Sequence, residues 1–453
     1  MGLAETIAAG AVHELALFAA VGIALGGIDD LLVDLIWVAR TLWRRFFIYS
    51  RHARANAADL TGMGRVAIFV PAWQEAGVIG AMLKTAQARW ADSGYRIYVG
   101  CYPNDSETRA AIPDAPHIRL VINPRPGPTT KGDNLNAMWR AMLADETAEG
   151  RTFDAVALHD AEDVVHPAEI GIFGALCPRF DLVQLPVLPL IEKERGIWAQ
   201  TVSATYADEF AESHGKMLTV REAVGAAVPS AGVGCCMSRN MLGHIADRFG
   251  TPFDEGSVTE DYELGLRVAE MGGQGIFVRL PGKAGGAAVA VRAHFPDTIE
   301  AAVRQKARWQ TGIALSGWNR LGWRGGWAEY WMRFRDRRAI LAALILLCAY
   351  VSGAALLALR ATGRAPHFSD AELSLFTLCT ALMAWRLAVR AAFVRHTYGW
   401  AEAAASIPRA LIGNFIAMAA ARRALISYLG IARGAPLVWD KTDHDFPRTL
   451  PAE

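Results

Sequence analysis

Cysteine is scarce in this chain, and the few cysteines present are not arranged for metal binding or for a disulfide framework. Among 453 residues there are six, and they form neither a C-x-x-C pair nor a Cys/His pattern typical of zinc. Because disulfides persist in oxidising compartments, reduced cysteines favour a chain that faces the cytosol or a membrane. The six are Cys101, Cys177, Cys235, Cys236, Cys348 and Cys379.

Two further absences narrow the class of protein. The formal net charge is only +1, so charge gives no reason to expect a nucleic-acid partner. Residues 1–12 contain no Lys or Arg and therefore lack the basic n-region of a cleavable signal peptide. The sequence shows no internal repeats or long low-complexity tracts, but it is 53% hydrophobic, which is high for a soluble enzyme.

This hydrophobic excess lies at the two ends of the chain and predicts membrane helices there. Residues 7–28 form an apolar run long enough for one span, with a buried soluble helix as the alternative. Residues 339–359 and 373–394 predict two more spans, joined by a periplasmic loop at 360–372. The Trp- and Arg-rich stretch 318–338 is typical of interfacial helices. Residues 401–429 contain Pro408 and several Arg, which favours an interfacial helix over a fourth span.

The distribution of basic residues predicts the orientation of these spans. No Lys or Arg precedes residues 7–28, whereas several Arg follow at 40, 44, 45, 51 and 54. Since positive charge stays on the cytoplasmic side, the N-terminus is expected outside and the next domain in the cytoplasm. We therefore divide the chain into five segments: a membrane and interfacial helix at 1–60, a cytoplasmic domain at 61–316, interfacial helices at 317–338, two membrane helices at 339–396, and an interfacial helix with a tail at 397–453.

The cytoplasmic segment reads as an α/β domain. Apolar strands are expected at 66–70, 95–101, 118–122 and 155–158, with helices at 77–91 and from 131 to about 142 between them. This alternation implies a mostly parallel sheet with helices on both faces. Polar clusters follow three of the strands, and in such sheets ligands sit beyond the carboxyl ends of the strands. The clusters are residues 71–75, 102–106 and 160–163.

The cluster after the fourth strand contains three acids, Asp160, Glu162 and Asp163. Carboxylates gathered this closely repel one another unless a cation joins them, and oxygen ligands suit Mg²⁺ or Mn²⁺. The alternative is a solvated acidic turn before a helix that begins near Pro167.

The second half of the domain supplies four more features. Residues 232–236 are a small-residue turn that a ligand or backbone could approach closely. Residues 259–263 open a helix that runs to Met271. Another helix begins near 296–300, with Asp297 as the N-cap acid and Glu300 three residues on. On that helix one face carries Gln305, Arg308 and Trp309.

Taken in order between membrane segments, these motifs resemble the processive, membrane-embedded glycosyltransferases of family 2, to which cellulose and hyaluronan synthases belong. The resemblance covers roughly residues 65–315 and rests on Asp105, Lys131, Asp160-Ala161-Glu162, Thr259-Glu260-Asp261 and the Q-x-x-R-W motif at 305–309. A closer likeness to one bacterial inner-membrane branch of the family spans nearly the whole chain. The stretches of sequence that carry this closer likeness are residues 70–73, 102–105, 125–129, 159–163, 229–234 and 439–442.

The resemblance implies a GT-A-like, Rossmann-type fold and a role for each motif. Glu75 and Asp105 would contact the uridine, and Lys131 the nucleotide side of a UDP-sugar donor. Asp160 and Glu162 match the metal-binding D-x-D, with Asp163 as an alternative ligand because Glu replaces the second Asp. The catalytic base would be Asp261, with the adjacent Glu260 as the next candidate. The Q-x-x-R-W residues Gln305, Arg308 and Trp309 would bind the departing phosphates and the acceptor.

The activity implied is inverting transfer of a sugar, an N-acetylhexosamine in this branch, to a growing surface polysaccharide at the bacterial inner membrane. The implied partners are the donor, a glycan acceptor, the lipid bilayer and an outer-membrane export protein. Relatives in this branch carry a C-terminal domain that senses a cyclic dinucleotide; this sequence stops at Glu453, so that control is not carried over.

Structural alternatives remain for individual residues: Asp261 as a helix N-cap, Lys131 as a surface lysine, and Trp309 as packing. The alternative for the whole chain is an envelope scaffold or phage-entry component with a retired transferase domain.

Overall fold

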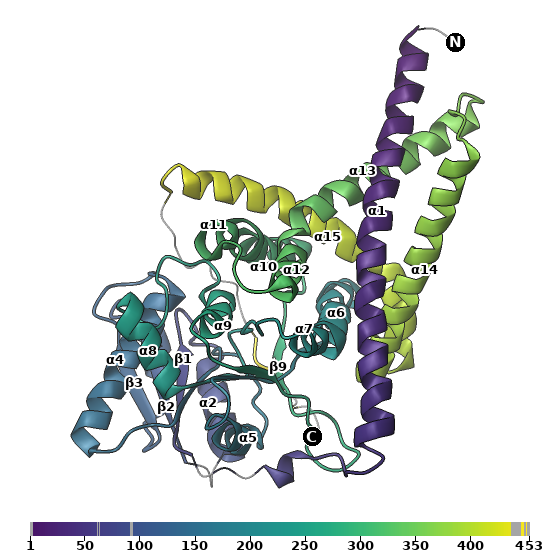
Figure 1. Ribbon diagram of the computed structural model, residues 1–453. Coiled ribbons are helices and arrows are strands. Elements are labelled where there is room, and N and C mark those ends of the chain that lie inside the picture. Colours follow the sequence, from purple (N-terminus) through teal and green to yellow (C-terminus); the bar gives the residue numbers. More distant parts are fainter. Residues whose placement is uncertain are drawn as a thin grey trace.

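The computed structural model describes residues 3–60, 62, 64–90, 94–435, 445–447 and 450. Its centre is a seven-stranded sheet with the order β3-β2-β1-β4-β7-β5-β8 (Figure 1). The strands are β1 Val66–Pro71, β2 Tyr95–Cys101, β3 Ile118–Ile122, β4 Ala155–Leu158, β5 Leu182–Gln184, β7 Cys235–Ser238 and β8 Gly275–Phe277. Only β7 runs antiparallel to its neighbours in this sheet. The expected mostly parallel α/β sheet is therefore confirmed.

Helices cover both faces of this sheet, as the continuous apolar runs of its central strands require. All six residues of β1 are buried, and alternate ones face opposite sides. Ile68 and Val70 pack with α2 (Ile79–Arg89) and α5 (Glu169–Leu176). Ala67 and Phe69 pack on the other side, with α4 (Lys131–Glu149), α8 (Arg239–Phe249) and α9 (Glu260–Glu270). The short helix α3 (Ser106–Ala111) follows β2.

Three predicted strands match the structure residue for residue, namely 95–101, 118–122 and 155–158. The turn predicted at 232–236 is wrong at its end, because Cys235 and Cys236 begin β7 and pair with β4 and β5. Buried cysteines behave as small hydrophobes, so a strand in the sheet interior accepts them. A second, two-stranded sheet joins β6 (Val187–Leu190) in parallel to β9 (Val291–His294).

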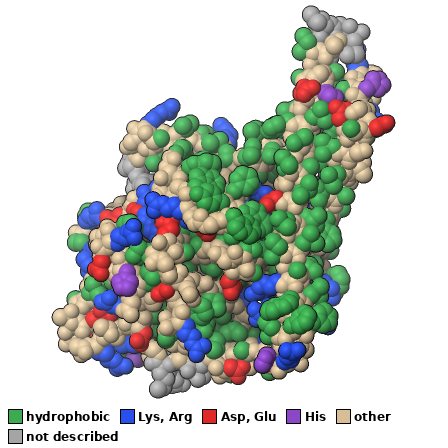
Figure 2. Space-filling model, viewed as in Figure 1, with side chains coloured by type: hydrophobic (Ala, Val, Ile, Leu, Met, Phe, Trp, Pro, Cys, Tyr) green, Lys and Arg blue, Asp and Glu red, His purple; other side chains and the backbone are tan. Residues whose placement is uncertain are grey.

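Four described helices are long and apolar enough to cross a membrane: α1 (Leu3–Trp43), α13 (Ala339–Ala361), α14 (Asp370–Tyr398) and α15 (Trp400–Ala432). In Figure 1, α1, α13 and α14 form a column that projects beyond the sheet domain. Figure 2 shows hydrophobic side chains along this column, with charged side chains gathered near its tip. The predicted spans at 7–28, 339–359 and 373–394 all lie within these helices.

The first helix is longer than the predicted span. At about 1.5 Å per residue, its 41 residues extend roughly 60 Å, about twice the thickness of the hydrocarbon core of a bilayer. Its inner half packs instead on the helices that follow α6 (Ile197–Glu212), namely the π-helical turn Ser213–Met217 and α7 (Leu218–Ala223). α1 thus connects the column of long apolar helices to the sheet domain.

A partly buried charge cluster reinforces this joint. Asp29, Asp30 and Asp34 of α1 form ion pairs with basic side chains from three other elements. For example, Arg338 lies 2.7 Å from both Asp29 and Asp30. Because buried charges are costly unless paired, these contacts restrict α1 to one position on its neighbours. The basic partners are Lys216, Arg335, Arg338 and Arg386.

α15 is a fourth candidate span by length and composition, whereas the sequence favoured an interfacial helix. Its first part packs against α14, where Ala403 contacts Val394, and in Figure 1 the helix then passes over α10 (Ile299–Gln310). Ala420 and Ala424 pack on Ala307 of α10. The interfacial placement therefore stays a prediction, as do the interfacial helices at 317–338, where the structure has α11 (Gly317–Leu321) and α12 (Trp327–Arg337).

The start of α10 differs from the sequence expectation, because its N-cap is Thr298 and not Asp297. The Thr298 hydroxyl accepts a hydrogen bond from the Ala301 N–H at 3.3 Å, while Asp297 forms an ion pair with Arg195. A hydroxyl one residue later reaches the free amides of the first turn equally well.

We therefore expect Thr298→Ala to cost about 1 kcal/mol of stability and Asp297→Ala clearly less, since the ion pair of Asp297 is partly exposed. Thermal unfolding in detergent measures both, with Thr298→Ser as the conservative control. An Asp297 variant that melts below the Thr298 variant would contradict this assignment.

Candidate functional site

The carboxyl ends of β1, β2 and β4 meet at one edge of the sheet, and the polar residues predicted after each strand converge there. Asp105 caps α3, and its second carboxylate oxygen accepts a hydrogen bond from the Gln74 N–H at 2.6 Å. The Glu75 N–H donates to the Thr108 hydroxyl at 2.8 Å. Gln74 has a φ of 55°, a left-handed conformation uncommon outside glycine. These contacts fix the loop after β1 to the loop after β2, so Glu75 and Asp105 lie together as expected.

Lys131, the first residue of α4, connects this edge to the acids of two other elements. Its ammonium donates to Asp160 Oδ1 at 2.7 Å. Burial lowers the pKa of Lys131, but the charges of Asp160, Glu260 and Asp261 outweigh it and raise that pKa above its ordinary value. The interpretation of Lys131 as a surface lysine is wrong, because its side chain is only 12% exposed. One largely buried cation thus lies among acids from the loop after β4 and from α9.

The loop that carries Asp160 is held by a buried histidine that the sequence reasoning missed. His159 lies between two carboxylates, with Nδ1 2.9 Å from Asp163 and Nε2 3.1 Å from Glu169. Burial lowers the pKa of His159, but these two partners raise it to about 10, so the ring is an imidazolium at neutral pH. The spacing of His159 and Asp163, four residues apart, was the available signal.

This arrangement bears on the predicted metal site at Asp160 and Glu162, for which Asp163 is the alternative ligand. Asp163 Oδ2 already contacts His159 and accepts the Asp160 N–H at 3.0 Å, so Asp163 positions the loop. Within the described residues, no group of three His, Cys, Asp or Glu side chains is arranged to hold a metal ion. Asp160 and Glu162 remain candidates. A pair of carboxylates suits Mg²⁺, which is usually bound by one or two carboxylates together with substrate phosphates.

Asp261 lies in the first turn of α9 and faces a glycine turn. The helix begins at Glu260 with Thr259 in the N-cap position, so the interpretation of Asp261 as the N-cap is wrong. Asp261 Oδ1 instead accepts the Tyr262 N–H at 2.7 Å. A Cβ on Gly232 would lie 2.2 Å from Asp261 Oδ2, and Gly232 has a φ of +76°, so only glycine fits. The sequence predicts that a ligand or backbone approaches the turn at 232–236, whereas at Gly232 the approaching group is the Asp261 side chain.

Glu260 is buried beside Asp261. Burial and the neighbouring Asp261 raise the pKa of Glu260 to about 7, while Lys131 and Arg308 act in the opposite direction. Two adjacent carboxyl groups thus differ in environment, since Glu260 is buried and Asp261 is only half-buried. Such separation is typical of sites in which only one acid of a pair acts as a base.

Of the Q-x-x-R-W residues on α10, Arg308 lies close enough to this acid pair to act on it electrostatically. The charge of Arg308 acts on Glu260, and its Nε is buried without a hydrogen bond. The Oε1 atom of Gln305 is also buried and unbonded. Buried polar atoms of this kind are costly unless a ligand satisfies them. Trp309 packs edge-on against Tyr206, with ring centroids 6.0 Å apart, so packing accounts for at least part of its role. The stretch 439–442, which also carries the predicted likeness to one branch of the family, lies outside the described residues.

Comparison with known proteins shows to which family this sequence is similar. The model of the glycosyltransferase-like family 2 matches residues 64–312. Two curated relatives, bacteriophage adsorption protein B of Escherichia coli K12 and bacteriophage N4 adsorption protein B of E. coli O157:H7, are each 37% identical over 93% of this chain. The chain spans 60% of the length of these relatives.

The solved structures that this chain resembles are less similar to it in sequence than these relatives. A mannosyltransferase from Pyrobaculum calidifontis, in complex with GDP-mannose and Mn²⁺, is 16% identical with a TM-score of 0.47, over 87% of this chain and 99% of its own. Glucosyl-3-phosphoglycerate synthase from Mycobacterium tuberculosis, in complex with Mn²⁺, UDP and phosphoglyceric acid, is 16% identical with a TM-score of 0.33, over 58% of this chain and 80% of its own.

Proposed function

This chain belongs to the glycosyltransferase-like family 2, and we propose that it transfers an N-acetylhexosamine from a UDP-sugar to a growing surface polysaccharide, with inversion at the transferred carbon. The observation that carries the proposal is the cluster at the carboxyl edge of the sheet, where Lys131 lies among Asp160, Glu260 and Asp261. Ionisable groups with strongly perturbed pKa values cluster at functional sites, which favours a catalytic role for this group of charges.

The roles follow from the chemistry of the leaving group. Negative charge grows on the nucleoside diphosphate as the sugar departs, and Lys131 and Arg308 are the cations near that edge. A divalent ion held by Asp160 and Glu162 would supply further stabilisation of the phosphates. The acceptor hydroxyl must lose a proton to a positioned base, for which we propose Asp261. One base suffices for single-displacement inversion. Glu260 would therefore not act as a second base but would influence the electrostatic potential at Asp261. Glu75 and Asp105 would contact the uridine.

The test of activity is nucleotide release by the purified chain in detergent, with a panel of UDP-sugars, Mn²⁺ and a chelator control. We expect UDP release from at least one UDP-N-acetylhexosamine. A folded protein that releases no nucleotide from any donor would favour the scaffold or phage-entry alternative, which the names of the relatives leave open. Retention of labelled glycan by the protein would identify a polymeric product, and any outer-membrane export partner would act on that product.

The proposed location is the bacterial inner membrane, with the sheet domain in the cytoplasm. We expect reporter fusions at Arg364, between α13 and α14, to be periplasmic, because this loop lies at the tip of the helical column. Fusions at His396, near the end of α14, should be cytoplasmic, since arginines flank that end. Alkaline phosphatase and fluorescent-protein fusions measure both. A cytoplasmic signal at Arg364 would contradict the model of three spans.

A further inference from the structure

A fully buried glutamine, Gln184, lies at the end of β5 beside the turn at residues 231–234. A polar side chain in the interior of a sheet is costly unless its polar atoms form hydrogen bonds. The oxygen of Gln184 accepts one backbone N–H, and its nitrogen donates to three backbone carbonyls. Three of these four partners belong to the turn, so the side chain holds the turn at both of its ends. The partners are the Ala231 N–H at 2.8 Å and the carbonyls of Leu185, Val233 and Gly234 at 2.8, 3.0 and 3.3 Å.

The turn has little rigidity of its own, because two of its four residues are glycines in the left-handed region. Gly232 has a φ of +76° and Gly234 a φ of +56°. Glycine loses more conformational freedom on folding than any other residue, so a turn of this kind needs restraints from outside. Besides Gln184, the Ser230 hydroxyl supplies such a restraint, since it accepts the Gly232 N–H at 3.1 Å.

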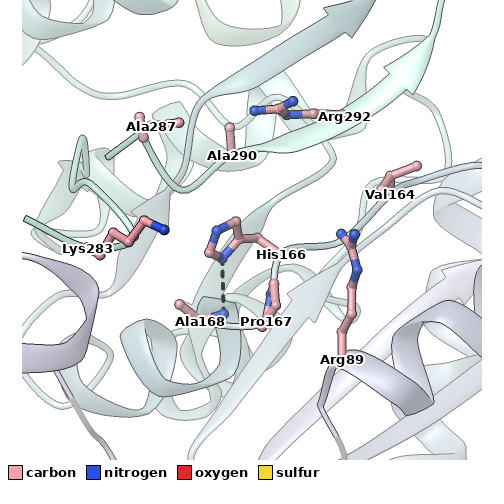
Figure 3. Close-up of a pocket in the computed structure, with 11 residues that line it drawn as sticks. Arg89, Val164, His166, Pro167, Ala168, Lys283, Ala287, Ala290 and Arg292 are labelled. Atoms are coloured by element: carbon pink, nitrogen blue, oxygen red, sulfur yellow. Dashed lines mark hydrogen bonds between the residues drawn. The ribbon is translucent and has the colours of Figure 1, made fainter. Parts of the chain in front are cut away.

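The end of the turn is also fixed by packing against β9. A Cβ on Gly234 would lie 2.6 Å from Val291 Cγ2, so the turn lies directly on this side chain. Successive residues of a strand point to opposite sides. The next residue of β9, Arg292, lines a cavity of about 330 Å³ on the other side of the strand, which Figure 3 shows. The turn therefore lies outside that cavity, between Val291 and the side chain of Gln184.

The middle of the turn borders the proposed base. Asp261 Oδ1 accepts the Tyr262 N–H at 2.7 Å, which leaves Oδ2 to take the proton of the acceptor hydroxyl. Oδ2 is also the atom that faces Gly232, since a Cβ on Gly232 would collide with it. A shift of the turn towards α9 would push this oxygen out of place, and a shift away would remove the contact that limits its motion. The position of the reacting oxygen thus depends on the turn.

We propose that Gln184 is a positioning residue for sugar transfer, which holds the turn at 231–234 in the shape that places Asp261 Oδ2 for proton removal. This proposal rests on the proposed function, in which Asp261 is the base. Gln184 forms hydrogen bonds with the turn and not with Asp261, so it acts through the turn. A misplacement of about 1 Å can cost a reaction roughly 100-fold in rate. Loss of these hydrogen bonds should therefore slow transfer without weakening donor binding.

The test is a double-mutant cycle on Gln184 and Asp261, with UDP release from a UDP-N-acetylhexosamine measured in detergent with Mn²⁺. Gln184→Met keeps the approximate size of the side chain but removes its acceptor and its donor. Alone, it should lower turnover by about 10–100-fold and change donor affinity by less than about twofold. In the Asp261→Asn background it should change turnover by less than about twofold, because the group that it misplaces is already lost.

Two further variants complete the experiment, and melting temperatures show whether each protein is folded. Gln184→Glu keeps an oxygen for the Ala231 N–H but places a carboxylate oxygen against three carbonyls, so it should also slow turnover. It replaces Gln184→Met in the cycle if that variant is unfolded at the assay temperature. Gln200→Met makes the same substitution on α6, where the amide lies 3.5 Å from Glu402, and should leave turnover unchanged.

The proposal is overturned if the folded Gln184 variants turn over at the wild-type rate. It is also overturned if Gln184→Met slows the wild type and Asp261→Asn by the same factor, because a merely structural role gives that additive result. Near-normal turnover in Asp261→Asn would remove the base on which the proposal rests. A wild type that releases no nucleotide from any donor would instead contradict the proposed function itself, so the two failures are distinguishable.

Discussion

Replacing Asp261 by asparagine is expected to slow sugar transfer by about 10²–10⁴-fold, the usual contribution of a general base, and to leave donor affinity nearly unchanged. The amide has the size of the carboxylate and keeps an oxygen that can accept the Tyr262 N–H. It cannot take up the proton of the acceptor hydroxyl. Because the N-cap position of α9 belongs to Thr259, the substitution should cost little stability.

The measurement compares turnover, donor affinity and melting temperature for Asp261→Asn and for Asp247→Asn. Asp247 is exposed on α8 and serves as the matched control, since it loses the same charge away from the site. A low turnover with normal affinity and melting supports the assignment of the base. Near-normal turnover in Asp261→Asn would move the base elsewhere, and Glu260 would be tested next because it is buried directly beside Asp261.

Much of the fold follows from the sequence because parallel strands buried on both faces must be continuously apolar. The runs at 118–122 and 155–158 end where their hydrophobic residues end, at Asn123 and His159, which fixed the C-terminal bounds of these strands. The antiparallel strand β7 could not be predicted in this way. It is four residues long, and its two cysteines follow glycines that also fit a turn. Only pairing with β4 and β5, at long range in the chain, makes it a strand.

Parts of the site could likewise be predicted from local sequence, whereas other parts depend on contacts between residues far apart in the chain. The spacing of Asp160 and Glu162 after a strand was sufficient to place them at the sheet edge. The role of Asp163 as the alternative ligand stays a prediction. Its pairing with His159 could not be predicted, because it depends on burial in the folded chain. Gly232 could be identified as a point of close approach. That Asp261 is its neighbour depends on how α9 packs against the turn, which no local pattern encodes.

Asp160→Asn is expected to abolish metal-dependent donor binding, with a loss of at least about 100-fold in the presence of Mn²⁺. Even partners in the outer shell of a metal ligand are worth roughly 10–100-fold, and a direct ligand should exceed that. Asp160 would face both a dication and a diphosphate, so removal of its charge weakens the ion that joins them. In addition, Lys131 loses its 2.7 Å partner and becomes free to pair with the diphosphate. Weak binding without metal should therefore persist in the variant.

The decisive measurement is donor affinity with Mn²⁺ and with chelator for Asp160→Asn, Glu162→Gln and Asp163→Asn. Glu162→Gln should resemble Asp160→Asn if both acids hold the metal. Asp163→Asn should instead lower the melting temperature, because it removes one carboxylate from the buried His159 imidazolium. Equal donor affinity with and without metal in the wild type would rule out a metal at Asp160. A metal-dependent loss of donor affinity in Asp163→Asn at normal melting temperature would show that Asp163 is a metal ligand.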